Sequence, residues 1–168
     1  MAEIWDLIDK DRNPTNLTHK RGEPIPDGLY HVVIHCWLIS RDGKFLLSQR
    51  QVGCTDPLLW ERTGGSVLSG ETSREGAIRE VKEELGIDVS CVPTYFVKSQ
   101  IRKHYHDFYD AWLFVVDKDV VVAPQQEEVR QTAWLTVEEI DQMDKNAQIV
   151  DTSRYYRQVY KFFKENCQ

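Results

Sequence analysis

The segment from Gly65 to Ile87, GSVLSGETSREGAIREVKEELGI, constrains this chain more than any other part of its sequence. At about 100° per residue, a helix would place three of its glutamates on one arc and four apolar residues on another. The glutamates are Glu80, Glu83 and Glu84, and the apolar residues are Ala77, Ile78, Val81 and Leu85. The segment therefore combines a core-facing side with a neighbouring wall of carboxylates, and clustered hard oxygen ligands of this kind suit magnesium or manganese.

The ends of this helix are marked in the sequence. Thr72 followed by Glu75 has the form of a capping box, and Gly86 supplies a glycine stop. Within the helix, Glu80 and Glu84 form a like-charge pair at i,i+4 spacing, which costs roughly 0.2–0.5 kcal/mol on an exposed helix. A sequence shaped only by helix stability would not concentrate acidic residues there, so the pattern indicates glutamates with a chemical task.

The spacing of these residues matches every fixed position of the Nudix box. The matching positions are Gly65, Glu71, Arg79, Glu80, Val81, Glu83, Glu84, Gly86 and Ile87. On this segment the chain resembles the Nudix hydrolases. The resemblance implies an α/β fold, the Nudix α/β/α sandwich with a mixed β-sheet, in which the box forms a loop, a helix and a second loop. It also implies an enzyme, a hydrolase acting on phosphorus-containing anhydrides.

The same resemblance implies a divalent metal, Mg²⁺ or Mn²⁺, held by the box. Glu80 and Glu84 would be the main ligands, and Glu83 would be a third ligand or the group that orients water. The carbonyl of Gly64, just ahead of the box, would add a further metal bond. A diphosphate is stable and heavily charged, so its hydrolysis needs charge neutralisation and an activated water, and a metal bound by carboxylates supplies both.

Supporting roles follow from the resemblance as well. Arg79 would pair with Glu71, or with a neighbouring box glutamate, and hold it in place. Gly64 and Gly65 would let the backbone approach metal and phosphate where a side chain would obstruct them. The residues expected to act in catalysis are therefore Glu71, Arg79, Glu80, Glu83 and Glu84, with Gly65 beside the substrate.

Other side chains near the box are candidates for substrate contact. Arg50 ends the run FLLSQR and Arg62 lies just before the box, and their forked cations suit bidentate phosphate binding. Trp60 is either a stacking surface for a base or part of the core. Glu127 and Glu128 occupy a region where many Nudix enzymes carry an additional glutamate, so either is a candidate metal ligand or catalytic base.

The histidines leave two interpretations open. His104 and His106 lie in a polar segment that either faces the active site or forms a solvated turn. His31 and His35 alternate along one predicted strand, with His19 upstream. These three form either a metal site or hydrogen-bonded structural positions.

Length and composition agree with a single domain over residues 1–168, in which residues 1–28 form an N-terminal hairpin and an irregular connection. The apolar content of 41% and charged content of 29% are ordinary for a soluble globule. The N-terminus lacks a secretory signal, no apolar run approaches the roughly 18 residues of a membrane span, and the four cysteines form no C-x-x-C pair. We therefore expect a cytoplasmic enzyme with reduced thiols and no membrane partner. The net charge of −6 argues against a surface that binds a nucleic acid polymer.

The rest of the chain predicts strands and two further helices. The runs EIWDLID and TNLTHK read as two short strands around a turn, and further strands are expected at 31–39, 45–49, 92–101, 109–116 and 133–135. Thr136 with Glu139 offers a second capping box, for a helix near 137–143. A last helix is expected within 153–166, where Tyr156, Val159, Tyr160 and Phe163 recur at helical spacing.

The N-terminal half is also similar to isopentenyl diphosphate isomerase, a Nudix-fold relative. Both have an early hairpin, a histidine entering the first long strand, and a similar turn and arginine. The isomerase chemistry needs a cysteine in the loop between the tryptophan and the box glutamate, and residues 60–71 contain none. Because the box is also complete, a hydrolase is favoured, and the likeness then marks a Nudix subgroup that shares the hairpin. A third alternative, a ligand-sensing Nudix module without activity, usually loses box glutamates and adds a DNA-binding segment, and neither change is visible.

The variable loops determine which organic group the enzyme accepts on the diphosphate. The expected substrate is a small molecule, either a nucleoside diphosphate derivative or an oxidised nucleotide, with an isoprenoid diphosphate suggested by the N-terminal likeness. Tyr105 lies near the place of a tyrosine in diadenosine polyphosphate enzymes. The resulting hypothesis is metal-dependent hydrolysis of a diphosphate linkage, in which water attacks phosphorus and a glutamate takes the proton. Homodimers are frequent in the family, which leaves a homodimer open here.

Overall fold

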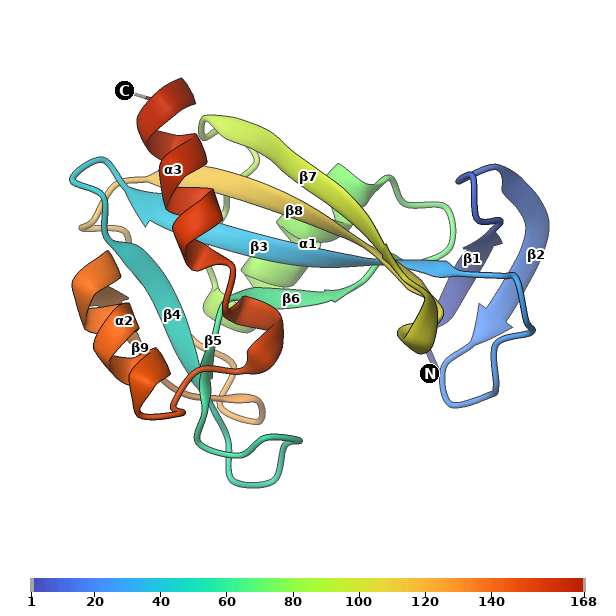
Figure 1. Cartoon of the computed structure of the whole chain (residues 1–168), viewed down its shortest axis with the longest axis horizontal. Helices are drawn as coiled ribbons and strands as arrows, with labels where there is room; N and C mark the ends of the chain where they lie inside the picture. The colour runs from blue at the N-terminus through green and yellow to red at the C-terminus, as the bar shows by residue number, and fades with distance from the viewer. Residues whose placement is uncertain (1, 168) are drawn as a thin grey trace.

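A seven-stranded mixed sheet forms the centre of the computed structural model, which describes residues 2–167 (Figure 1). Its two long strands, β3 (His31–Ser40) and β8 (Asp107–Val116), run parallel and pair along their whole length. Both are rich in β-branched and aromatic residues, which favour the pleated conformation. The other elements of the fold are arranged around these two strands.

The remaining strands of this sheet pair antiparallel. β4 (Phe45–Arg50) pairs with β3 and also contacts β5 (Trp60–Glu61) and β9 (Val129–Leu135). β6 (Thr63–Ser66) pairs with β3, and β7 (Thr94–Arg102) pairs with β8. β6 therefore lies beside the first half of β3, where it presents the start of the box next to the central strand.

Helices cover both faces of the sheet, as Figure 1 shows. α1 (Ser73–Leu85) packs on one face, while α2 (Val137–Lys145) and α3 (Tyr156–Asn166) pack on the other. Side chains of β3 alternate between the two faces, since successive residues of a strand point in opposite directions. Ile34, Cys36 and Leu38 contribute to the α1 side, and Trp37 and Ile39 contribute to the other side. The predicted α/β/α sandwich with a mixed sheet is confirmed.

The predicted elements are present, but several begin elsewhere than expected: β7 begins at Thr94 instead of residue 92, and β8 begins at Asp107 instead of residue 109. β9 begins at Val129 instead of residue 133, because the polar residues after Val129 continue the hydrogen-bonded ladder with β4 although their side chains are exposed. The last helix begins at Tyr156 instead of residue 153, because Asp151–Ser153 form a separate 3₁₀ turn, η2. Hydrophobic spacing marks buried positions, whereas strand and helix ends follow backbone hydrogen bonds.

The N-terminal hairpin forms its own two-stranded sheet from β1 (Ile4–Ile8) and β2 (Pro14–Lys20). The ring of Trp5 stacks on that of His31, with 4.1 Å between centroids. Arg12 donates two hydrogen bonds of 2.9 and 3.0 Å to the carboxylate of Asp110 on β8, whose side chain is only 2% exposed. The hairpin is therefore attached to the central sheet by both an aromatic contact and a forked ion pair.

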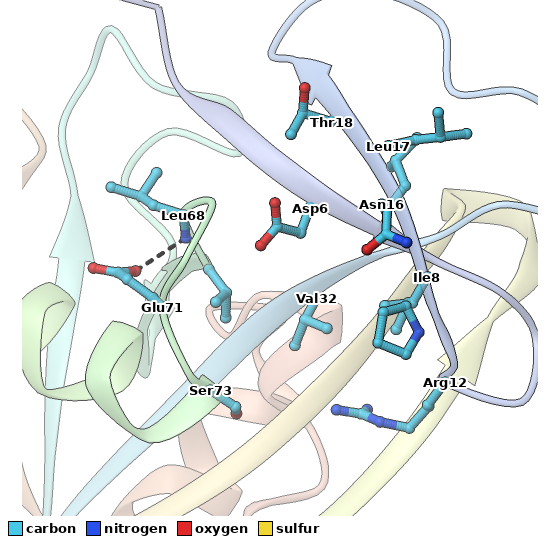
Figure 2. A pocket seen from close by; sticks show the side chains of 13 residues that line it. Asp6, Ile8, Arg12, Asn16, Leu17, Thr18, Val32, Leu68, Glu71 and Ser73 are labelled. Atoms are coloured by element: carbon cyan, nitrogen blue, oxygen red, sulfur yellow. Dashed lines mark hydrogen bonds between the residues drawn. The ribbon is translucent and has the colours of Figure 1, made fainter.

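The hairpin also contacts the loop that leads into α1. Asp6 accepts hydrogen bonds from the Ser69 hydroxyl at 2.6 Å and the Gly70 N–H at 2.9 Å, and the Ser69 N–H donates to the Ile4 carbonyl at 2.8 Å. A cavity of about 430 Å³ lies between hairpin and loop. Figure 2 shows side chains that line it, among them Asp6 and Glu71. These two carboxylates, like Arg12 and Ser73 beside them, already have hydrogen-bond partners in the protein.

Two properties of the whole chain complete the description. All four cysteines are free, and Cys36 is buried. Among residues 2–167, every helix is too short or too polar to cross a membrane.

Candidate active site

Three glutamates of α1 line a pocket of about 400 Å³. Its walls come from four segments: α1, β6, the two ends of the N-terminal hairpin and the loop before β9. The lining residues are Glu3, Arg21, Gly64, Gly65, Ser66, Glu80, Glu83, Glu84, Gln125 and Glu128. The structure thus gathers Gly64, Gly65 and the three predicted metal-binding glutamates in one place.

Local interactions set the position of α1. The predicted capping box is present, because the Thr72 side chain accepts from the Glu75 N–H while Glu75 accepts from the Thr72 N–H. Gly86 ends the helix in the left-handed conformation at φ 69°, which glycine adopts without strain. Ala77, Val81 and Leu85 are buried against the sheet. Their burial fixes the rotation of the helix and turns the adjacent arc of glutamates toward β6.

The loop before β9 reaches the pocket through the C-terminal end of α1. The Ala123 N–H donates to the Leu85 carbonyl, and the Gln125 N–H donates to the Glu84 carbonyl, each at 2.8 Å. These two bonds bring Glu128 to the pocket wall. Glu127, the other candidate from the sequence, is exposed and is not among the lining residues.

Glycine is required at Gly64, where a Cβ atom would meet backbone, and at Gly65 it leaves room for the Glu80 side chain. A Cβ atom at Gly65 would overlap the carboxylate of Glu80, and one at Gly64 would overlap the carbonyl oxygen of Ile34 on β3. The two glycines therefore allow α1 and β3 to approach β6 closely.

Arg79 connects several groups of the box. Its guanidinium donates to Glu71 at 2.7 and 3.0 Å, to Glu80 at 2.8 Å and to Glu83 at 3.1 Å. A further bond of 2.9 Å reaches the Ser66 carbonyl. Burial opposes the charge of Glu71, but the hydrogen bonds from Arg79 and from the backbone of Leu68 outweigh it and lower the pKa of that carboxyl. Arg79 therefore holds Glu71 as predicted and also orients Glu80.

The electrostatics of Glu84 differ from those of Glu71. Burial raises the pKa of Glu84 well above its ordinary value, and the nearby carboxylates of Glu80, Glu61 and Glu128 raise it further. Burial also raises the pKa of Glu80, although Arg79 opposes that shift. The pocket thus contains more buried negative charge than the protein itself neutralises.

A divalent cation fits this set of donors. Within residues 2–167, no three acidic, histidine or cysteine side chains already stand at metal-binding distance from one another, since Glu80 and Glu83 are directed toward Arg79. Hard carboxylate oxygens with an uncompensated charge are nevertheless the ligands that Mg²⁺ and Mn²⁺ prefer. Glu80, Glu84 and Glu128, with the carbonyl of Gly64, would hold such an ion.

The two candidate phosphate-binding arginines lie beside the pocket and outside its lining. Arg50 donates to Glu61 at 2.5 Å and to the Thr55 carbonyl. Arg62 is buried and lies 3.5 Å from Glu61. Glu61, Arg50, Glu84 and Glu128 line a small cavity of about 30 Å³ next to the main pocket. Trp60 is half-buried and packs against the core on the α2 and α3 side.

The histidines occupy structural positions. Burial lowers the pKa of His31, which stacks on Trp5, to about 4. The His19 ring lies 2.9 Å from the Glu23 carbonyl. His104 is exposed in η1 (Lys103–Tyr105), and the His106 ring lies 3.4 Å from the Leu29 carbonyl. The structure places none of these four histidines in the carboxylate pocket.

His35 belongs to a second cavity, of about 390 Å³, on the α3 side of the sheet. Its ring stacks on Tyr109 at 4.4 Å between centroids, and its Nδ1 lies 2.8 Å from the Tyr155 hydroxyl. The exposed ring of Tyr105 and the guanidinium of Arg102 also line this cavity. Because α1 and α3 cover opposite faces of the sheet, the carboxylate pocket beside α1 and the aromatic cavity beside α3 lie on opposite faces as well.

Several lining residues were missed by sequence reasoning. Glu3 and Arg21 lie far before the box in the sequence, and Gln125 lies far after it. Glu61, which lies next to this pocket, belongs to no motif in the sequence. In the structure its carboxylate raises the pKa of Glu84. Only the docking of the hairpin and of the loop before β9 onto α1 brings these side chains together.

Comparison with known proteins agrees with this geometry. A family model described as NUDIX domain matches residues 29–156. An uncharacterized Nudix hydrolase of Listeria monocytogenes is 34% identical over 153 residues, which cover 88% of this chain and 88% of that protein. Isopentenyl-diphosphate Delta-isomerase 1 of Bos taurus is 26% identical over 170 residues, covering 85% of this chain and 73% of the bovine protein.

A solved structure shares the fold. The crystal structure of a Deinococcus radiodurans protein superposes with a TM-score of 0.76 at 20% identity, covering 92% of this chain and 98% of the other. Together with the match of the family model and the complete box, these similarities establish membership. The chain belongs to the Nudix hydrolase family, with the isopentenyl diphosphate isomerases as distant relatives.

Proposed function

We propose that this protein hydrolyses the diphosphate linkage of a small organic pyrophosphate, most plainly a nucleoside diphosphate derivative, with Mg²⁺ or Mn²⁺. The observation that supports this most strongly is the pocket in which Glu80, Glu83, Glu84 and Glu128 converge beside the glycines of β6. A bound divalent ion would neutralise phosphate charge and activate a water molecule there.

The residues of the chain have separate tasks in this reaction. Glu80, Glu84 and Glu128 hold the cation, and Arg79 keeps Glu80 oriented while Glu71 anchors Arg79. Water attacks one phosphorus, the bond from that phosphorus to the bridging oxygen breaks, and the other phosphate departs with the bridging oxygen. The proton from water passes to a carboxylate that does not hold the cation, for which Glu83 is the candidate in the pocket.

The aromatic cavity supports a nucleoside as the group attached to the diphosphate. His35 and Tyr109 are buried there and stack on each other, Tyr155 lies beside His35, and Tyr105 exposes its ring. Aromatic faces of this kind stack on nucleobases. Among the described strands, β6 pairs only with β3, so a ligand passing round the free side of β6 would reach both the base cavity and the glutamates.

A hydrolysis screen in which the products are separated by ion-exchange chromatography tests the proposal, because cleavage of the diphosphate linkage in ADP-ribose or a dinucleoside polyphosphate releases no free phosphate. The panel contains nucleoside triphosphates, oxidised nucleotides, ADP-ribose, dinucleoside polyphosphates and isopentenyl diphosphate, each with Mg²⁺ or Mn²⁺. We expect metal-dependent cleavage of at least one nucleotide, reduced about 100-fold or more by Glu84→Gln and by Glu80→Gln, as is typical when a group that acts in the transition state is removed. Turnover that survives both substitutions contradicts the proposal.

A matched control is Glu165→Gln, which removes one carboxylate from the exposed side of α3. Its turnover should equal that of the unmodified protein, and circular dichroism should show the same fold for all variants. The panel also addresses the isomerase alternative, because Cys54 lines the small cavity beside Glu84. Rearrangement of isopentenyl diphosphate, without hydrolysis of any substrate, would favour an isomerase.

A further inference from the structure

Arg21 is the one cationic side chain that the described residues contribute to the lining of the carboxylate pocket. It follows β2, at the end of the N-terminal hairpin. Five of the other lining residues are glutamates: Glu3, Glu80, Glu83, Glu84 and Glu128. A divalent ion would compensate the charge of the glutamates. Arg21 would then be the positive side chain of the lining that can bind an anion attracted by that ion.

The other arginines near the pocket are already engaged. Arg79 donates to Glu71, Glu80 and Glu83 and to the Ser66 carbonyl. Arg50 is paired with Glu61, and Arg62 is buried next to the same carboxylate. The side chain of Arg21 is 65% exposed and its Nη1 donates to Glu3 at 2.8 Å. Arg21 is therefore the arginine of this region with the most freedom to reorient toward a ligand.

The backbone of Arg21 is held at the edge of the pocket while its side chain is free to turn. Its N–H donates to the Glu3 carbonyl at 3.0 Å, which joins the two ends of the hairpin. The next residues along β1 are attached to the box loop through Ile4 and Asp6, and Trp5 is stacked on His31. Figure 2 shows Asp6 facing the loop residues Leu68 and Glu71. The hairpin thus presents Arg21 to the pocket from a fixed position.

We infer that Arg21 binds a phosphate group of the substrate's diphosphate, and that Glu3 holds its guanidinium in the free protein. A guanidinium forms short, forked hydrogen bonds with phosphate oxygens. Binding of a diphosphate would transfer Arg21 from the single Glu3 contact to that anion. The inference rests on the proposed function and adds to it a substrate-binding residue that the N-terminal hairpin supplies.

Binding of methylenediphosphonate, a diphosphate analogue whose bridging carbon resists hydrolysis, tests the inference. Isothermal titration calorimetry with Mg²⁺ present should show that Arg21→Gln weakens binding about tenfold or more, since a hydrogen bond to a charged group is lost. Arg21→Lys should restore part of the affinity. The response of the melting temperature to Mg²⁺ alone should be unchanged in both variants, because Arg21 does not bind the metal.

Lys20→Gln is the matched control. It removes the same charge from the adjacent exposed residue, which does not line the pocket, and the analogue should bind it as tightly as it binds the unmodified protein. Equal weakening by Lys20→Gln and Arg21→Gln would overturn the inference, because the effect would then reflect net charge. Unchanged binding in Arg21→Gln would overturn it as well.

Glu3→Gln gives a result that a purely structural role would not produce. It releases Arg21 from its partner, so the analogue should bind a few-fold more tightly, and this gain should disappear when Arg21 is also replaced by Gln. A gain that persists in the double variant would overturn the holding role of Glu3. If the unmodified protein hydrolyses a substrate but Arg21→Gln has no effect, only the inference fails. If the unmodified protein neither binds the analogue nor hydrolyses any substrate, the proposed function fails too.

Discussion

At the scale of single residues, the buried carboxylate of Glu84 lowers the stability of the metal-free protein, although the proposed reaction needs it. Its pKa is raised, so the folded protein holds the Glu84 proton more strongly than the unfolded chain does. The resulting stabilisation is present below the unfolded pKa and is lost as pH rises through the folded pKa. At neutral or higher pH, the metal-free protein therefore carries the cost of a buried charge.

Glu84→Gln should accordingly raise the stability of the metal-free protein at pH 8 while it abolishes activity. Each unit of pKa shift corresponds to about 1.4 kcal/mol, and each kcal/mol raises the melting temperature of a chain of this length by roughly 2–4 °C. Thermal unfolding in EDTA at pH 8 and at pH 4 checks this, with the gain expected only at pH 8. The side chain of Glu83 is 55% exposed, so Glu83→Gln should give no gain. A lower melting temperature for Glu84→Gln at pH 8 would contradict the argument.

At the scale of elements, the forked ion pair between Arg12 and Asp110 is one of the contacts that attach the hairpin. Arg12→Ala would leave the carboxylate of Asp110, with a side chain 2% exposed, without its forked partner. We expect a loss of about 2–3 kcal/mol, the cost of an unsatisfied buried charged group, measured by urea unfolding. Adding Asp110→Asn to Arg12→Ala should recover part of the loss, since the uncompensated charge is removed.

Lys10→Ala is the comparison for this ion pair. Lys10 pairs with Asp11 at the exposed turn of the hairpin, with side chains 71% and 64% exposed. An exposed pair contributes less than about 1 kcal/mol, so Lys10→Ala should cost little. Equal losses for Lys10→Ala and Arg12→Ala would show that the Arg12 contact does not attach the hairpin.

At the scale of the whole molecule, the carboxylate pocket joins α1, β6, the hairpin ends and the loop before β9. A cation bound there stabilises the folded chain by RT ln(1 + [L]/Kd), about 2.7 kcal/mol when the ion is at a hundred times its dissociation constant. The melting temperature should then rise by roughly 5–10 °C. The rise should be larger at pH 8 than at pH 5, because Glu80 and Glu84 must lose their protons to bind metal.

Differential scanning calorimetry with MgCl₂, against NaCl at equal ionic strength, measures this effect. Glu84→Gln should remove most of the rise, and EDTA should reverse it in the unmodified protein. An equal rise in NaCl would show that the ion acts by screening and does not occupy the pocket.

The sequence by itself determined the elements whose information is local. The capping boxes at Thr72 and Thr136, the glycine stop at Gly86 and the arc of Glu80, Glu83 and Glu84 follow from residues a few positions apart, and all are present in the structure. The residues of the box therefore predicted α1 and half of the residues that line the pocket. The ends of β9 and α3 were less predictable, since backbone hydrogen bonds to other elements set them.

Only the tertiary structure decided which distant side chains complete the pocket. Glu128 was distinguished from Glu127 by the bonds that attach its loop to Glu84 and Leu85. Arg21 was placed at the glutamates by the docking of the hairpin, while Arg50 and Arg62 were directed to Glu61. Such contacts join residues far apart in the sequence, and they depend on packing and on the burial of charge, which neither spacing nor composition encodes.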